Sequence, residues 1–159
     1  MTVYTIGVYD WDRQTFFAAL GRAHVDVLVD VRRRRAVRGP HYAFANARRL
    51  IAELQRNGIA YVHALELAPP KELLALQHAI DAEGPGMRAR TKLAPAYVKG
   101  YRSEVLARAD FAALARELEP YRAPALMCVE RLPQACHRSL AAPRLARAVH
   151  ATAVHDLLP

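Results

Sequence analysis

The chain has 159 residues, of which 53% are hydrophobic and 24% are charged, and its formal net charge is +8. This length and balance predict one soluble globular domain over residues 1–159. No apolar run is long enough to span a bilayer, and the N-terminus lacks the basic start and apolar stretch of a secretory signal. We therefore expect a cytosolic protein that does not bind membranes, with both of its cysteines reduced.

The positive charge has two explanations. It can attract a nucleic acid or an anionic small molecule. It can also reflect solvated helix faces, because arginine far exceeds lysine and many arginines recur at helical spacing. The position of the arginines is therefore more informative than their total.

The N-terminal half alternates between strand and helix patterns. β-Branched and aromatic residues predict strands at 2–8, 25–32 and 59–65, and helical periodicity predicts helices at 12–23 and 46–58. Asp12 and Asn46 are positioned to cap the two helices, and Gly58 to end the second. A long, basic connection interrupted by Gly and Pro, residues 32–47, separates the second strand from the second helix.

The C-terminal half continues the alternation. The pattern predicts a helix opened by prolines at 66–84, a polar connection at 85–95, two short helices within 96–121 broken near Ala109–Asp110, a buried strand at 123–130, a helix at 137–150 that contains Pro143, and a last strand at 152–157. Strands that alternate with helices predict an α/β domain whose mostly parallel sheet has about five strands. In such a sheet, ligands bind beyond the carboxyl ends of the strands.

The stretch ALMCVERLPQACHRSLAA holds both cysteines, Cys128 and Cys136, and the second is followed at once by His137 and Arg138. A helix predicted to start here favours anions, and the arginine fork suits phosphate, sulfate or carboxylate. Positive charge beside Cys136 should favour its thiolate. We therefore expect Cys136, Cys128, His137 and Glu130 to be candidate catalytic residues, with Glu130 either a general acid or base or simply the partner of a nearby arginine.

Plainer explanations exist for the same residues. Cys128 can be a small buried hydrophobe of a strand, and Arg138 can form a salt bridge in the first helical turn. Cys128, Cys136 and His137 are all possible zinc ligands, but zinc sites usually pair cysteines two to four residues apart and need a further pair. Adjacent Cys136 and His137 would also point apart in a helix. The sequence therefore predicts neither a metal nor another cofactor.

The loop after the second strand is the other candidate ligand-binding region. Its arginines are Arg32, Arg33, Arg34, Arg35 and Arg38. They can guide an anionic substrate into a cleft, neutralise several phosphates, or form a solvated loop. His41 and Tyr42 interleave with them, as stacking on bases requires, although they can equally fold the loop onto the core. Asp30 is placed to orient Arg32 or Arg138, and we expect those two arginines to share one anion site.

The chain resembles a known family, the domain of unknown function 488. The resemblance rests on YTIG, LVDVR (28–32), NGIAYVH (57–63), the Cys-x-Glu…Cys-His-Arg block and AVHDL, in that order along nearly the whole chain. It implies a compact α/β domain and marks Asp30, Arg32, Cys128 and Glu130 as motif positions, together with Cys136, His137 and Arg138. Family members commonly have His-Ser after TIG, where this chain has Val8-Tyr9.

Two functions follow as expectations. The first is recognition of an anionic, phosphate-bearing ligand at the carboxyl edge of the sheet, with cysteine-dependent chemistry on that ligand as an open question. The second is nucleic-acid binding as an accessory protein through the basic loop 32–38. Their salt dependence separates them, because binding to a polyanion weakens steeply as salt rises.

Overall fold

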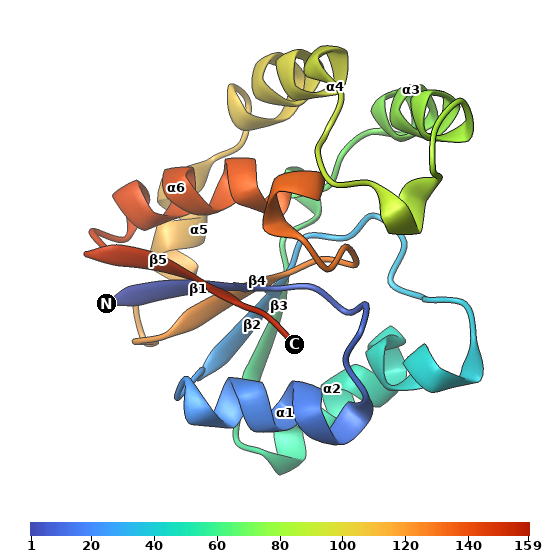
Figure 1. The fold of residues 1–159 in the computed structure, drawn as a ribbon. Helices are drawn as coiled ribbons and strands as arrows, with labels where there is room; N and C mark the ends of the chain where they lie inside the picture. Colours follow the sequence, from blue (N-terminus) through green and yellow to red (C-terminus); the bar gives the residue numbers. More distant parts are fainter.

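The computed structural model describes residues 1–159 and contains one five-stranded sheet in the order β3-β2-β4-β1-β5 (Figure 1). The strands are β1 (Thr2–Ile6), β2 (Val27–Asp30), β3 (Ala60–His63), β4 (Pro124–Met127) and β5 (Ala153–Leu157). All four neighbouring pairs are parallel. The predicted α/β class and parallel sheet are confirmed.

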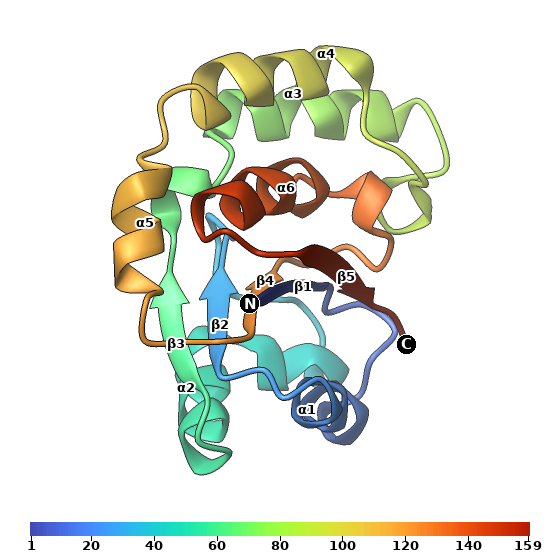
Figure 2. The ribbon, with the colours of Figure 1, turned by 90° about the vertical axis from the view of Figure 1, so that its left-hand side faces the viewer.

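Helices cover both faces of this sheet. They are α1 (Arg13–Arg22), α2 (Ala47–Arg56), α3 (Lys71–Ala82), α4 (Pro95–Gly100), α5 (Phe111–Glu117) and α6 (Arg138–Ala148). Figure 1 shows α1 and α2 on one face and α5 and α6 on the other, and Figure 2 shows α3 and α4 as a further layer outside α6. None of the helices combines the length and apolar character that crossing a membrane needs.

Short helical turns complete the connections. Single 3-10 segments cover Pro40–Ala45, Leu65–Leu67, Met87–Ala89 and Pro133–Ala135, and a π-helical turn, Tyr101–Leu106, continues α4. The expected break near Ala109–Asp110 is present, and the Asp110 side chain caps α5.

Three predictions about helix starts can be compared with the structure, which confirms one and corrects two. Asp12 caps α1 as expected, through a bond from the Thr15 amide. Asn46 does not cap α2, because its Oδ1 instead accepts from the Val37 amide in the basic connection. The helix predicted from residue 66 begins at Lys71, after the extended residue Pro70.

The two faces of the sheet bury separate cores, as the alternation of residues along the strands requires. Val27, Val29 and Leu126 pack on the α6 side, whereas Leu28 and Met127 pack on the α1 side. Every residue of β2 and β4 is buried, as expected for parallel strands covered on both faces. Cys128 continues the alternation of β4 and joins the core on the α6 side.

The connections after β2 and β4 leave the sheet toward opposite faces, to α2 and to α6 (Figure 1). These strands are neighbours. A crevice therefore opens beyond their carboxyl ends, which is where ligands bind in open α/β sheets.

Gly7, directly after β1, allows the first loop to press against the segment after β4. The amides of Val8 and Tyr9 both donate to the Val129 carbonyl, at 2.9 and 3.0 Å. A Cβ atom on Gly7 would lie 1.9 Å from the Glu130 carbonyl oxygen. Only glycine fits here without a shift of the backbone.

We predict that Gly7→Ala destabilises the protein by about 2 kcal/mol or more, because a backbone carbonyl and not a flexible side chain must move. Gly21→Ala in α1 is the matched control, since a Cβ there meets nothing within 4 Å. The control should be stabilised by about 0.5–1 kcal/mol. Urea denaturation of both variants measures the difference, and equal stabilities would contradict the close approach at Gly7.

Candidate functional site

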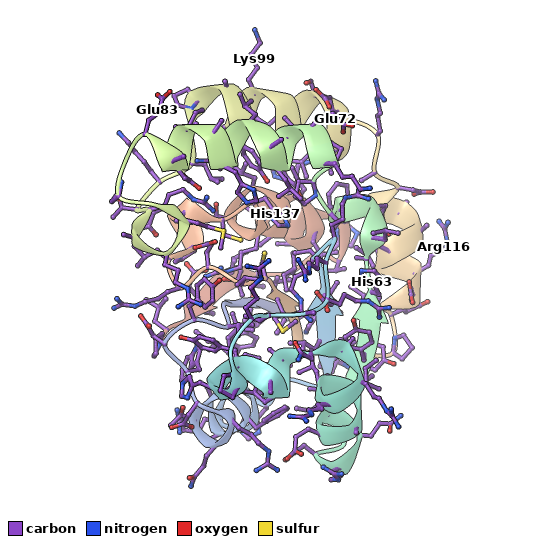
Figure 3. The ribbon with its side chains drawn as sticks, turned by 90° about the vertical axis from the view of Figure 1, so that its right-hand side faces the viewer. His63, Glu72, Glu83, Lys99, Arg116 and His137 are labelled. Atoms are coloured by element: carbon purple, nitrogen blue, oxygen red, sulfur yellow. The ribbon has the colours of Figure 1, made fainter.

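A cavity of about 590 Å³ lies at the carboxyl edge of the sheet, in the crevice beyond β2 and β4. Cys128, Cys136, His137 and Glu130, all buried, line its inner end, which we call the floor. Exposed basic side chains from two other segments line its mouth: Arg34, Arg38, His78 and Arg88. Figure 3 shows His137 beneath α3 and at the start of α6. All four predicted catalytic residues thus lie in one pocket.

The backbone between β4 and α6 brings the cysteines and the histidine together. The Cys128 amide donates to the Ile6 carbonyl at 3.1 Å, beside the end of β4. After the 3-10 turn Pro133–Ala135, Cys136 is extended, with φ −139° and ψ 144°. His137, with φ −62° and ψ −18°, already has helical geometry.

This change of conformation puts both neighbouring side chains beside Cys128. His137 Nδ1 lies 3.9 Å from Cys128 Sγ and 3.8 Å from Cys136 Sγ. The expectation that Cys136 and His137 point apart in a helix does not hold, because the helix begins only after Cys136. The objection that these two side chains cannot join Cys128 in one cluster is therefore removed.

One hydrogen bond fixes the orientation of the His137 ring. Its Nε2 lies 3.0 Å from the Val31 carbonyl oxygen, beyond the end of β2. A carbonyl only accepts, so Nε2 carries the proton, and in the neutral ring Nδ1 keeps its lone pair. That lone pair faces the two sulfur atoms.

The buried position of the floor shifts the acidity of its groups. Burial raises the pKa of the Cys136 thiol, but the Cys128 hydrogen bond, the polar contact with His137 and the charge of Arg138 lower it more, so the net pKa lies well below the ordinary value. The hydrogen bond with Cys136 and burial together raise the pKa of Cys128 well above its ordinary value. Burial raises the pKa of Glu130 to about 7, against the lowering effect of Arg90.

Arg138 does not open into the pocket. It is fully buried, and each of its three guanidinium nitrogens donates within the protein. Nε donates to Thr5 Oγ1, and the other two nitrogens donate to the carbonyls of Glu130 and Arg131. None of the ion pairs includes it. Its contacts hold β1, the segment after β4 and the start of α6 together.

Arg32 is likewise a buried structural residue. Its Nε and one terminal nitrogen donate to the two carboxylate oxygens of Asp30, at 2.9 and 2.7 Å, and the other donates to the Ala45 carbonyl. The Tyr61 hydroxyl also donates to Asp30. Asp30 therefore orients Arg32 and not Arg138, which is one of the two expected alternatives. The anion site that Arg32 and Arg138 were expected to share is not formed, because both guanidinium groups are buried and bonded within the protein.

The other arginines of the basic loop diverge. Arg33 donates to the carbonyls of Ala68 and Pro69, and Arg35 donates to the Tyr61 hydroxyl. Of the five arginines in this loop, only Arg34 and Arg38 line the mouth of the cavity.

The two aromatic residues after the basic loop, His41 and Tyr42, pack against each other with ring centroids 4.9 Å apart, but they face different hollows. His41 lines a different surface hollow, together with Arg13 and Arg49. The Tyr42 ring lies 5.2 Å from that of Tyr9, which lines the main cavity. Tyr9 occupies the first loop, where the resembled family has a Ser.

Residues from 77 to 90 complete the site and were not predicted. The Arg88 guanidinium lies 5.0 Å from the centre of the Tyr9 ring. Arg90 pairs with Asp81 at 2.5 Å and with Glu130 at 3.4 Å, and it also donates to the Ala135 carbonyl. The only signal in the sequence is two arginines in the MRAR tetrapeptide of a polar connection, which does not show that they fold back onto the floor.

Replacing Arg138 with lysine should lower the free energy of unfolding by about 3 kcal/mol, because one ammonium group cannot reach the three acceptors that the planar guanidinium holds. Arg147→Lys, on the exposed side of the same helix, should change stability by no more than about 0.5 kcal/mol. Thermal and urea unfolding measure both. A loss at position 147 as large as that at position 138 would contradict this role.

Comparison with known proteins identifies one family. The family model described as "Domain of unknown function DUF488" matches residues 12–145. That range includes β2, β3, β4 and every residue of the floor. Searches of the curated proteins and of the solved structures each found no match. On the family match, the chain belongs to the DUF488 family.

Proposed function

We propose that the protein binds an anionic, phosphate-bearing small molecule in the main cavity and acts on it through the cysteines of the floor. One observation carries the proposal: a single cavity joins exposed arginines at its mouth to buried thiol, imidazole and carboxyl groups at its inner end. Pockets with perturbed titratable groups and a few convergent polar side chains are the usual form of small-molecule sites.

Arg34 and Arg38 are the groups best placed to receive the anion. Both are exposed and line the mouth, and neither takes part in an ion pair. Guanidinium forks bind phosphate oxygens in pairs, and such charge-assisted bonds are the strong ones. The apolar walls formed by Leu74, Met87 and Leu93 would hold the remainder of the ligand.

Nucleic-acid binding through the basic loop 32–38 is the second candidate and has less support. Arg32 is buried, and the exposed Arg33 and Arg35 each donate to another group of the protein, so only Arg34 and Arg38 are left at the cavity mouth. For either function we propose a cytosolic site of action, which suits two free cysteines.

Phosphate-bearing compounds should raise the melting temperature of the protein, and the double variant Arg34→Ala/Arg38→Ala should bind them about tenfold more weakly or worse. The loss follows from removing charge-assisted hydrogen bonds worth about 1.5–3 kcal/mol. Isothermal titration with nucleoside monophosphates, sugar phosphates and inorganic phosphate tests this. Arg116→Ala is the control, because Arg116 is exposed on α5, away from His137 (Figure 3). Unchanged affinity in the double variant would refute the anion site.

Salt dependence separates the two candidate functions. A duplex bound through several phosphates loses affinity with a log–log slope of about −0.9 for each phosphate neutralised. A small ligand held by two arginines should show a shallow slope instead. Fluorescence anisotropy with labelled duplex and single-stranded oligonucleotides, repeated across salt concentrations, measures this. Tight, steeply salt-dependent binding that needs Arg34 and Arg38 would favour the nucleic-acid function.

Catalysis is tested by incubating the protein with a mixture of phosphate-bearing metabolites and following each compound by mass spectrometry. The wild-type protein should consume at least one compound, and Cys136→Ser should not. The Arg116→Ala protein serves again as the control and should retain full activity. Consumption that survives Cys136→Ser would contradict cysteine dependence, and no consumption at all would leave a binding protein.

A further inference from the structure

We propose that Cys128, Cys136 and His137 bind one divalent transition-metal ion, with the fourth coordination position open to the cavity. The two sulfur donors and one nitrogen donor indicate that this ion is Zn²⁺. The inference rests on the geometry of the floor alone and does not require the anionic ligand. Under this proposal, activity would depend on the two cysteines because they are metal ligands.

Both sulfur–nitrogen distances in the cluster are close to those of a tetrahedral site. Cys128 Sγ, Cys136 Sγ and His137 Nδ1 all lie within 4.8 Å of one another, and the two sulfur–nitrogen distances are 3.9 and 3.8 Å. Zn–S bonds of about 2.3 Å and Zn–N bonds of about 2.0 Å place tetrahedral sulfur and nitrogen ligands about 3.6 Å apart. Small side-chain movements would therefore close the site on an ion.

The histidine is oriented as a metal ligand. Its Nε2 proton is donated to the Val31 carbonyl, so the coordinating lone pair lies on Nδ1, toward the sulfur atoms. Metal-bound histidines almost always give their other ring proton to a carbonyl, carboxylate or water, which fixes the tautomer. Here the acceptor comes from the end of β2, so two strands of the sheet set the geometry.

The donor set selects the kind of metal. Two thiolates and one imidazole are soft and borderline ligands, which favour zinc and related ions over Mg²⁺ or Ca²⁺. Both cysteines bind Zn²⁺ as thiolates, and the resulting centre of one dication and two thiolates is neutral. A neutral centre is compatible with the buried guanidinium of Arg138 close by.

Three protein ligands leave one position of a tetrahedral ion free. All three residues line the cavity, and Glu130 lines it beside them. Structural zinc sites close with four protein ligands, whereas sites with three and an exchangeable position are of the catalytic type. The free position would take water or an oxygen of the anionic ligand.

The test begins with protein stripped of metal by a chelator under reducing conditions. Titration with Co²⁺ should saturate at one ion per chain and produce the near-ultraviolet thiolate-to-cobalt charge-transfer absorption and the intense visible bands of tetrahedral cobalt. Zn²⁺ should displace the cobalt and bleach these bands. Binding that never approaches one ion per chain, or a spectrum without thiolate charge transfer, would refute the site.

Variants assign the ligands. Cys128→Ser, Cys136→Ser and His137→Gln should each weaken zinc binding about a hundredfold or more in competition with a chromophoric chelator, since loss of even an outer-shell partner costs up to about that much. His78→Gln is the matched control, because His78 lines the same cavity but is exposed and lies outside the cluster. Loss of affinity in the control equal to that in the ligand variants would contradict the assignment.

A second measurement keeps the proposal testable if a ligand variant fails to fold. In the wild-type protein, one equivalent of Zn²⁺ should slow alkylation of Cys128 and Cys136 together by about tenfold or more, because bound thiolates are poor nucleophiles. Peptide mass spectrometry reads each cysteine separately. Alkylation rates that Zn²⁺ does not change would overturn the metal site. Such a result would not affect the proposed anion binding, which is measured separately with the Arg34→Ala/Arg38→Ala variant.

Discussion

The buried guanidinium of Arg138 is the constraint on which the rest of the structure depends. It joins a β1 hydroxyl to two consecutive carbonyls after β4, and it does so from the first residue of α6. A charge that is fully desolvated without an ion-pair partner is tolerated only when hydrogen bonds satisfy it. Because His137 and Cys136 immediately precede this residue, the contacts that satisfy Arg138 also place the floor of the cavity.

A second layer of buried charge connects the floor to the helices above it. Arg90 bonds to Asp81 of α3, to the Ala135 carbonyl and to Glu130. Gln77, also on α3, accepts from the Ala94 amide and donates to Asp81. The outer helical layer is therefore attached to the floor of the cavity by polar contacts as well as by apolar packing. A ligand that changes the charge at Glu130 would act directly on that attachment.

Order, type and direction of the main elements could be predicted from the sequence, because hydrophobic period and turn residues are local signals. The placement of Cys128, Cys136, Glu130 and His137 at the carboxyl edge of the sheet could also be predicted, but the approach of the Cys136 and His137 side chains to Cys128 could not. The roles of Arg32 and Arg138 could not be predicted either, because a motif arginine after a strand or at the start of a helix is the same in sequence whether it is buried or open. The bend at Cys136 depends on a 3-10 turn and on the long-range contacts of its neighbours, and Tyr9, Arg88 and Arg90 reach the cavity only through tertiary folding.

The volume of the cavity limits what can reach its floor. About 590 Å³ accommodates a molecule of nucleotide size and not a duplex. The donor atoms of Cys128, Cys136 and His137 lie at the inner end, beneath a mouth formed by side chains from the basic loop and from residues 78–88. A polymer that docks on the arginines can therefore offer the floor only a terminus or a single extruded unit, so chain ends and monomers are the ligands to screen first.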